Sequence, residues 1–201
     1  MQRQPQQNRS QKRVNQILDV AEQLLIEGGH KATTTRAIAA RAQIPIGSLY
    51  QFFPDKEAIC KALAFRYNQQ MYEMFKALHT EAAVTMPLSM YVDRAIDTFD
   101  QFFVEHPGYQ AIFIQSQDLL PVLEEVDAGF ASQIVQESAA FLAQRAPSID
   151  LAKHKLVALL IVEGAGQRLW MSLGRYQALR EQILPEIKVL VLAYLQQHLN
   201  V

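Results

Sequence analysis

The side chains best equipped for chemistry in this chain gather in its first third. Thr34 and Thr35 precede an apolar run at helical spacing, so their hydroxyl groups suit a helix N-cap and can also donate to an anion. Ser48 and Gln51 carry the donors and acceptors that bond base edges, and a Gln amide can bridge N6 and N7 of adenine. These residue types favour recognition of nucleic acid.

Two short helices about a tight turn must position these side chains. Ile38 and Ala42 recur at helical spacing in the first helix. Pro45 ends it, because the residue before a proline is pushed out of the α region, whereas proline itself suits a first helical turn. The second helix begins at Pro45 or Ile46 and stops before Pro54. This pattern predicts a helix-turn-helix whose second helix enters the DNA major groove.

The stretch resembles the DNA-binding domain of the TetR family of bacterial transcriptional regulators. The family signature is close to T-x-x-x-I-A-x-x-A-x-(V/I)-x-x-G-x-L-Y-x-x-F-x-x-K-x-x-(L/I). It is filled here by Thr34, Ile38, Ala39, Ala42, Ile44, Gly47, Leu49, Tyr50, Phe53, Lys56 and Ile59. The resemblance covers roughly the first quarter of the chain, and the remainder matches in its all-helical character and length.

By this resemblance, Tyr50 and Lys56 bind phosphate, and Thr34 or Thr35 adds contacts at a helix N-terminus, where backbone amides and the helix dipole favour anions. Tyr50 has an alternative interpretation as a half-buried packing residue. Phe52 departs from the family pattern, because many members carry Tyr or His there as a further phosphate contact. We expect that contact to be absent.

Base reading is expected from the exposed side of the second helix. No Arg or Lys lies between Ile44 and Asp55, so this helix is poorly supplied for reading guanine, although Arg36 in the preceding helix could contribute. An apolar side chain such as Ile46 can instead meet a thymine methyl group. The predicted DNA-binding residues are Thr34, Thr35, Arg36, Ile46, Gly47, Ser48, Tyr50, Gln51 and Lys56.

Composition and charge agree with such a module fused to a second domain. Half of the 201 residues are hydrophobic, and strand signals are scarce, which favours an all-α fold. The formal net charge of −1 is unevenly divided. The first 60 residues hold eight Lys and Arg against five acids, giving +3, and the remainder therefore carries −4. A locally basic segment is what phosphate attraction requires.

Three regions are predicted. Residues 1–9 are polar and Gln-rich, and we expect a disordered basic arm that either makes no contact or touches phosphate. Residues 10–54 form the three-helix DNA-binding domain, whose first helix ends at Gly28-Gly29. Residues 55–201 form a helical ligand-binding and dimerisation domain. Its helices are expected at 55–79, 87–106, 109–115, 121–145, 151–173 and 176–200.

Partners follow from the resemblance. The last two helices read apolar over more than one face, and in the family this pair forms a four-helix interface between two copies. The second domain is expected to bind a small, largely apolar effector. Its pocket candidates are Tyr72, Phe99, Phe103, Tyr109, Phe113, Phe130, Glu163 and Trp170. Glu163 has the alternatives of pairing with Arg168 or Gln167 and of simple exposure.

Other chemistry is poorly supported. Cys60 could be a redox sensor, but inert packing is the preferred interpretation. Asp93, Asp97 and Asp100 recur on one helical face, where a solvated surface is favoured over a cation site. The five histidines are scattered without a catalytic or metal-ligand cluster, so we expect no enzyme, no metal and no cofactor.

The sequence therefore predicts a ligand-responsive transcriptional regulator that binds a double-stranded palindromic operator as a homodimer and is released by a small molecule. Repression is preferred to activation, which stays open. The alternative is a helical ligand-binding or adaptor protein without a gene-regulatory role. The longest aliphatic run is too short to span a bilayer, and the N-terminus lacks an apolar signal segment, so no membrane contact and a cytoplasmic location are expected.

Overall fold

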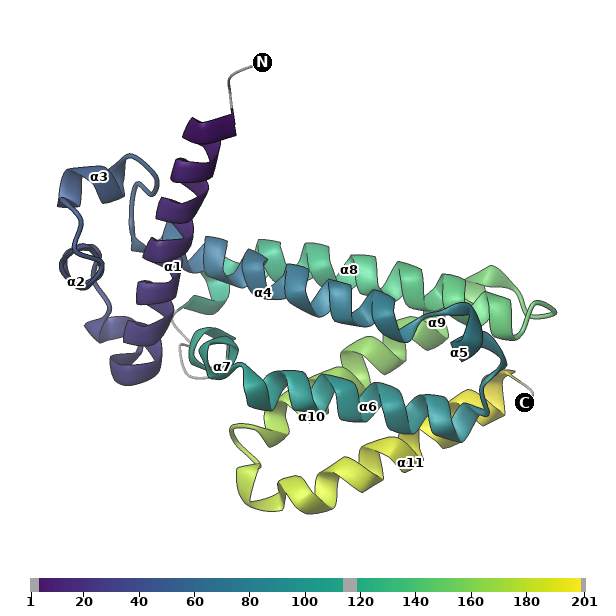
Figure 1. Ribbon diagram of the computed structural model, residues 1–201. Coiled ribbons are helices and arrows are strands. Elements are labelled where there is room, and N and C mark those ends of the chain that lie inside the picture. The colour runs from purple at the N-terminus through teal and green to yellow at the C-terminus, as the bar shows by residue number, and fades with distance from the viewer. Residues whose placement is uncertain (1–3, 114–118, 200–201) are drawn as a thin grey trace. The chain divides into compact units, whose positions relative to one another are not determined.

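The computed structural model describes residues 4–113 and 119–199, and every regular element within these ranges is helical (Figure 1). The all-α expectation is confirmed. The helices are α1 (Gln4–Ala32), α2 (Thr35–Arg41), α3 (Ile46–Tyr50), α4 (Lys56–Leu78), α5 (Glu81–Thr85), α6 (Leu88–Glu105), α7 (Pro107–Phe113), α8 (Leu120–Arg145), α9 (Leu151–Leu159), the π-helical η2 (Leu160–Gly166), α10 (Gln167–Ser172), the 3₁₀ turn η3 (Gln177–Leu179) and α11 (Arg180–Leu199).

The chain divides into two compact units. The first, here called the head, comprises Met1–Tyr67 and Pro107–Val126, and the second, the body, comprises Asn68–His106 and Asp127–Val201. The expected boundary lay at 54/55. The head is larger than expected because the first three turns of α4 are hydrogen-bonded to α1 and α7 packs against α1. Helix α4 thus continues without a break from the head into the body.

The core of the head is built from one stripe of α1 and the apolar sides of α2 and α3. Ile17, Ile38 and Leu49 are completely buried. Helix α1 has a kink at Gly29, whose φ of 69° lies in the left-handed region that glycine tolerates. The prediction that Gly28-Gly29 ends the first helix therefore holds for the helical geometry, although three further residues wind on to Ala32.

The N-terminal segment differs from the expected disordered arm. Helix α1 begins at Gln4, six residues earlier than the predicted start at Ser10. Gln and Arg are good helix formers, and Pro5 lies in the first turn, where its missing N–H costs nothing. The expectation of a disordered arm over residues 1–9 was wrong for residues 4–9, and residues 1–3 lie outside the described part of the chain.

In the body, the acidic row of α6 faces a basic row on α11. Asp100 accepts a hydrogen bond from Arg180 at 2.6 Å, and Lys188 lies 2.7 Å from Asp97 and 3.7 Å from Asp93. The preferred interpretation of this row as a solvated face was therefore wrong for Asp100, whose side chain is only 15% exposed. Arg180 lies 80 residues after Asp100, so the sequence pattern did not reveal this partner.

The two predicted C-terminal helices are interrupted. The 151–173 segment changes from α9 into the π-helical η2 over the sequence LIVEGAG and returns to α-helix in α10. Helix α11 starts at Arg180, after the turn η3, and it contains Pro185. Among the described residues, no single helix is long and apolar enough to cross a membrane, and the one pair that passes such a test together is bent by 100°.

Candidate nucleic-acid interface

Helices α2 and α3 form the predicted helix-turn-helix. Thr34 caps α2, because its Oγ1 accepts a hydrogen bond from the backbone N–H of Ala37 at 3.1 Å. The turn between the helices passes through Gln43, whose φ of 54° is positive. Gln16 of α1 donates its Nε2 to the carbonyl of Ala42 at 2.8 Å. This bond ties α1 to the turn between the two short helices.

Two further contacts hold α2 on α1. Arg41 donates both guanidinium nitrogens to the carboxylate of Glu27. This pairing lowers the pKa of Glu27 and raises that of Arg41. The pair is exposed, so its contribution to stability is small. It does, however, neutralise a cation that would otherwise be free to meet phosphate.

The exposed side of α3 carries the predicted base-reading residues. Ile46 is 40% exposed, Gln51 is exposed just after the last turn of the helix, and Ser48 is half-buried. Nothing lies within 4 Å of a Cβ built on Gly47, so this glycine leaves open space at the surface. Open space at this position lets the helix approach base edges closely.

Tyr50 and Thr35 meet at this surface. The hydroxyl of Tyr50 and Oγ1 of Thr35 are 3.1 Å apart, and either can donate. Tyr50 is 50% exposed, so about half of its surface is covered, and both the phosphate contact and the half-buried packing role stay predictions. Arg36 follows Thr35 on α2 and is exposed. Phe52 is half-buried, and its side chain has no polar group. Thr35, Arg36 and Tyr50 thus leave polar atoms available to an approaching phosphate.

Lys56, a predicted phosphate ligand, also makes a contact within the protein. Its Nζ donates to the backbone carbonyl of His30 at 3.0 Å, which ties the start of α4 to the end of α1. Asp55 caps the same helix by accepting from the backbone N–H of Ala58 at 2.7 Å. An ammonium group has three protons, so Lys56 can keep this bond and still donate to a phosphate. The sequence pattern could not reveal the first role.

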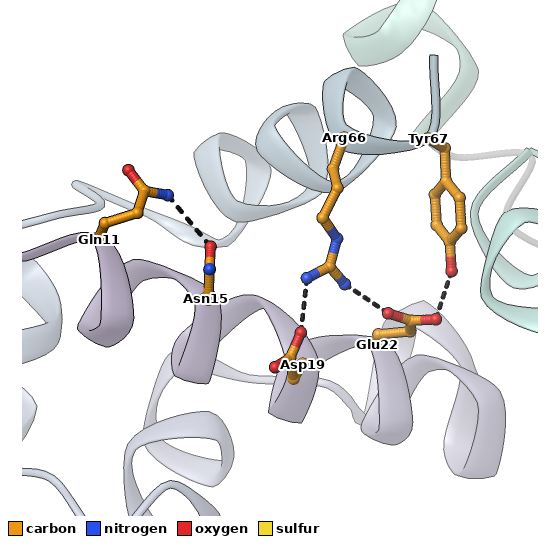
Figure 2. A network of polar contacts seen from close by, with 6 residues as sticks. All are labelled: Gln11, Asn15, Asp19, Glu22, Arg66 and Tyr67. Atoms are coloured by element: carbon orange, nitrogen blue, oxygen red, sulfur yellow. Dashed lines mark hydrogen bonds and ion pairs between the residues drawn. The ribbon is translucent and has the colours of Figure 1, made fainter. Parts of the chain in front are cut away.

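A polar network that sequence reasoning missed links α1 to α4 (Figure 2). Arg66 donates to Asp19 and to Glu22, and the Tyr67 hydroxyl donates to the second oxygen of Glu22. Burial and the neighbouring carboxylate raise the pKa of Tyr67, which therefore stays protonated as a donor. Arg66 and Tyr67 lie 44 and 45 positions after Glu22, so no short-range spacing in the sequence connects them.

The pocket candidates do not fall in one unit. Tyr109 and Phe113 are buried in the head, where Tyr109 packs against Tyr67 with ring centroids 5.7 Å apart. The six others belong to the body. Glu163 is exposed, which agrees with simple exposure. The remaining five residues, half-buried or buried, are Tyr72, Phe99, Phe103, Phe130 and Trp170.

Two of these side chains carry polar atoms of interest. Tyr72 donates to Glu137 across α4 and α8, which raises the pKa of its hydroxyl. Trp170 Nε1 is buried and meets no acceptor within the described part of the chain.

Cys60 is buried, and burial raises the pKa of its thiol to about 12, so it is unreactive as a thiolate. Residues 4–113 and 119–199 hold no group of three His, Cys, Asp or Glu side chains arranged for a metal ion.

The fold and this surface define a helix-turn-helix DNA-binding protein. Residues 17–63 match the family model described as "Bacterial regulatory proteins, tetR family", and residues 87–195 match the one described as "Tetracyclin repressor-like, C-terminal domain". The second match covers more than half of the chain. The chain therefore belongs to the TetR family of transcriptional regulators, as its N-terminal signature indicated.

Solved structures and curated relatives agree with this assignment. A TetR-family transcriptional regulator from Streptomyces coelicolor is 29% identical, with a TM-score of 0.67 and coverage of 94% of this chain and 98% of that one. FadR from Bacillus subtilis, solved with stearoyl-CoA, shares the fold at 18% identity and a TM-score of 0.60, over 86% of this chain and 96% of that one. The transcriptional repressor KstR from Rhodococcus jostii is 36% identical over 63 residues, which is 31% of this chain and only 30% of that protein.

Proposed function

We propose that this regulator is a repressor that binds a palindromic operator as a homodimer and leaves it when a small molecule binds the body. The observation that carries the DNA-binding part is the open face of α3. Ile46 and Gly47 are exposed at its start and Gln51 is exposed just after its end, and the hydroxyl groups of Tyr50 and Thr35 lie 3.1 Å apart at the same surface. Two-fold helix-turn-helix dimers read half-sites one helical turn apart, about 34 Å.

An exposed apolar surface supports the homodimer. Seven large apolar side chains on α9, η2, η3 and α11 are between 43% and 61% exposed. They are Leu151, Leu156, Leu159, Leu160, Leu179, Val189 and Leu190. Exposed apolar patches of this kind mark interfaces, and a second copy would bury the patch by two-fold symmetry.

The dimer is tested by sedimentation of the purified chain. Val189→Asp combined with Leu190→Asp places charge on the apolar surface without touching the buried core, so the variant is expected to sediment as a monomer and to lose operator binding. Val104→Asp is the matched control, because Val104 is 53% exposed on α6. A double variant that remains dimeric would contradict the proposed interface.

Release by an effector would pass through the chain segments that connect the two units. The chain crosses between head and body after Tyr67, before Pro107 and after Val126. Two of these crossings adjoin the Glu22 network, because Tyr67 bonds Glu22 and Gly108 packs on both. These chain segments are the proposed route by which a change in the body reaches the head. To move occupancy from nearly full to nearly empty, the effector must favour one state by about 5.5 kcal/mol.

The effector is proposed to be largely apolar, with aromatic contacts from the body. Trp170 is the only tryptophan of the chain, so its fluorescence reports on one place alone. Titration with candidate ligands should change that emission and raise the melting temperature together, because a ligand that binds only the folded state stabilises it. If a ligand releases the operator without changing Trp170 emission, Trp170 does not line the pocket.

A further inference from the structure

We propose that the N-terminal half of α1 is a second DNA-binding surface, which grips the phosphate backbone beside the groove that α3 reads. This inference rests on the proposed DNA-binding function and extends it to residues outside the helix-turn-helix. The occupant is the same duplex, recognised through phosphate charge and not through base edges.

The charges of the head divide α1 into two halves. All its acidic residues, Asp19, Glu22 and Glu27, lie in the second half, and each is bonded to an arginine of another helix. The first half carries Arg9, Lys12 and Arg13 and no acid. Within the described residues none of these three cations forms an ion pair, and the one bond that Arg13 makes is to the neutral amide of Gln16 at 3.0 Å. Internal pairing therefore leaves the first half cationic.

The three cations lie on the same face of α1 as Gln16, the residue that bonds the turn of the helix-turn-helix. Positions 9, 12, 13 and 16 follow the i, i+3, i+4, i+7 spacing of a single stripe. Gln16 on this stripe donates to the carbonyl of Ala42, in the turn between α2 and α3. The stripe therefore faces the side of the head on which α3 begins. In Figure 1 the N-terminal half of α1 lies level with α3, and its C-terminal half lies level with α2.

Burial in the core does not account for the helix over residues 9–16 of α1. Of residues 9–16 six are exposed and two, Arg13 and Val14, are intermediate, and the first buried residue after position 9 is Ile17. Val14 is the one apolar residue in the stretch 9–16, so core packing contributes little there, and the hydrogen bond from Gln11 to Asn15 at 3.1 Å supports the helix locally. Arg9 lies seven residues before Gln16, about 10 Å further along the helix axis, beyond the turn. Such a projecting cationic helix fits a DNA strand that passes beside the major groove occupied by α3.

The experiment measures affinity for an operator duplex, selected from a random library by the full chain, between 50 and 200 mM salt. The test variant is Arg9→Gln, Lys12→Gln and Arg13→Gln together. If all three cations of both subunits meet phosphate, the slope of log K against log salt becomes shallower by about 5.4, so wild type should lose on the order of a thousandfold more affinity over this range than the variant. Operator discrimination should not change, because phosphate carries no sequence information.

Two further variants separate this role from others. Arg9→Lys, Lys12→Arg and Arg13→Lys together keep the charge and should retain the wild-type slope. Arg94→Gln removes one exposed cation from α6 in the body and should leave the slope unchanged. An unchanged slope in the triple Gln variant would overturn the inference, as would a loss confined to particular base changes in the operator. Failure of wild type to bind any duplex would instead contradict the proposed function, and the inference with it.

Discussion

Gly108 packs directly on Glu22: a Cβ built on Gly108 would lie 2.6 Å from both Cγ and Oε1 of that glutamate. Real Cβ atoms are essentially never found so close to another heavy atom, and the Tyr67 hydroxyl lies closer still. The first turn of α7 therefore rests with its bare backbone on the carboxylate that Arg66 and Tyr67 hold. This contact joins α1, α4 and α7 within the head.

Gly108→Ala should destabilise the protein by about 1–3 kcal/mol, the usual cost of overpacking a filled site. Gly129→Ala is the matched control, because nothing lies within 4 Å of a Cβ at that helical position. There, alanine should stabilise by about 0.5–1 kcal/mol, since it loses less backbone entropy than glycine. Chemical denaturation measures both. Equal effects of the two substitutions would mean that the site around Gly108 relaxes freely.

Gln51→Ala should relax base preference at one position in each half-site. The amide of Gln51 is exposed at the end of α3, and a bidentate contact to adenine discriminates by about 1–3 kcal/mol against a wrong base. Affinity measured across operators with single base changes reports this directly. Unchanged discrimination at every position would show that Gln51 reads no base.

Lys56→Ala should affect folding and binding together. Loss of the bond from Nζ to the His30 carbonyl should lower the free energy of unfolding by about 1 kcal/mol. If Lys56 of both subunits also meets phosphate, affinity should fall nearly uniformly across sequences, and the salt slope should become shallower by about 1.8. A variant that is less stable but keeps the wild-type slope would confine Lys56 to its role between α1 and α4.

His79 should make the body sensitive to acid. Its Nδ1 lies 2.7 Å from the Phe75 carbonyl, and its Nε2 lies 2.8 Å from the Tyr91 hydroxyl, so a neutral ring donates to the first and accepts from the second. Burial lowers the pKa of His79, against the opposing effects of the Phe75 carbonyl and the charge of Glu137. Its neutral form is favoured in the folded state.

The unfolded chain therefore binds more protons at this position than the folded one as the pH falls below the ordinary histidine pKa of about 6.5. The contribution of neutral His79 to the free energy of unfolding is complete above that pH and is lost progressively below it. Between pH 7.5 and pH 5.5, His79→Gln should lose less unfolding free energy than wild type, as measured by urea denaturation. An identical loss in both proteins would contradict a neutral His79 in the fold.

The sequence predicted what depends on local patterns and failed where distant residues meet. The helix-turn-helix was found because Thr34, Pro45 and Pro54 mark its ends and its signature has fixed spacing. The partner of Asp100 was missed, because Arg180 lies 80 residues away on a helix whose own pattern shows only apolarity. For the same reason, the packing role of Gly108 could not be predicted from the sequence. Its close contact with Glu22 depends on how α7 packs against α1, which no local spacing encodes.

The most direct measurement for the account as a whole is selection of duplexes from a random library by the full-length chain, with the enriched sites tested at several salt concentrations. The account predicts an enriched palindrome whose half-sites lie about one helical turn apart, bound with a steep dependence on salt. Binding without any enriched motif would contradict it, because a face built from Ile46, Gly47, Ser48 and Gln51 would then read no bases.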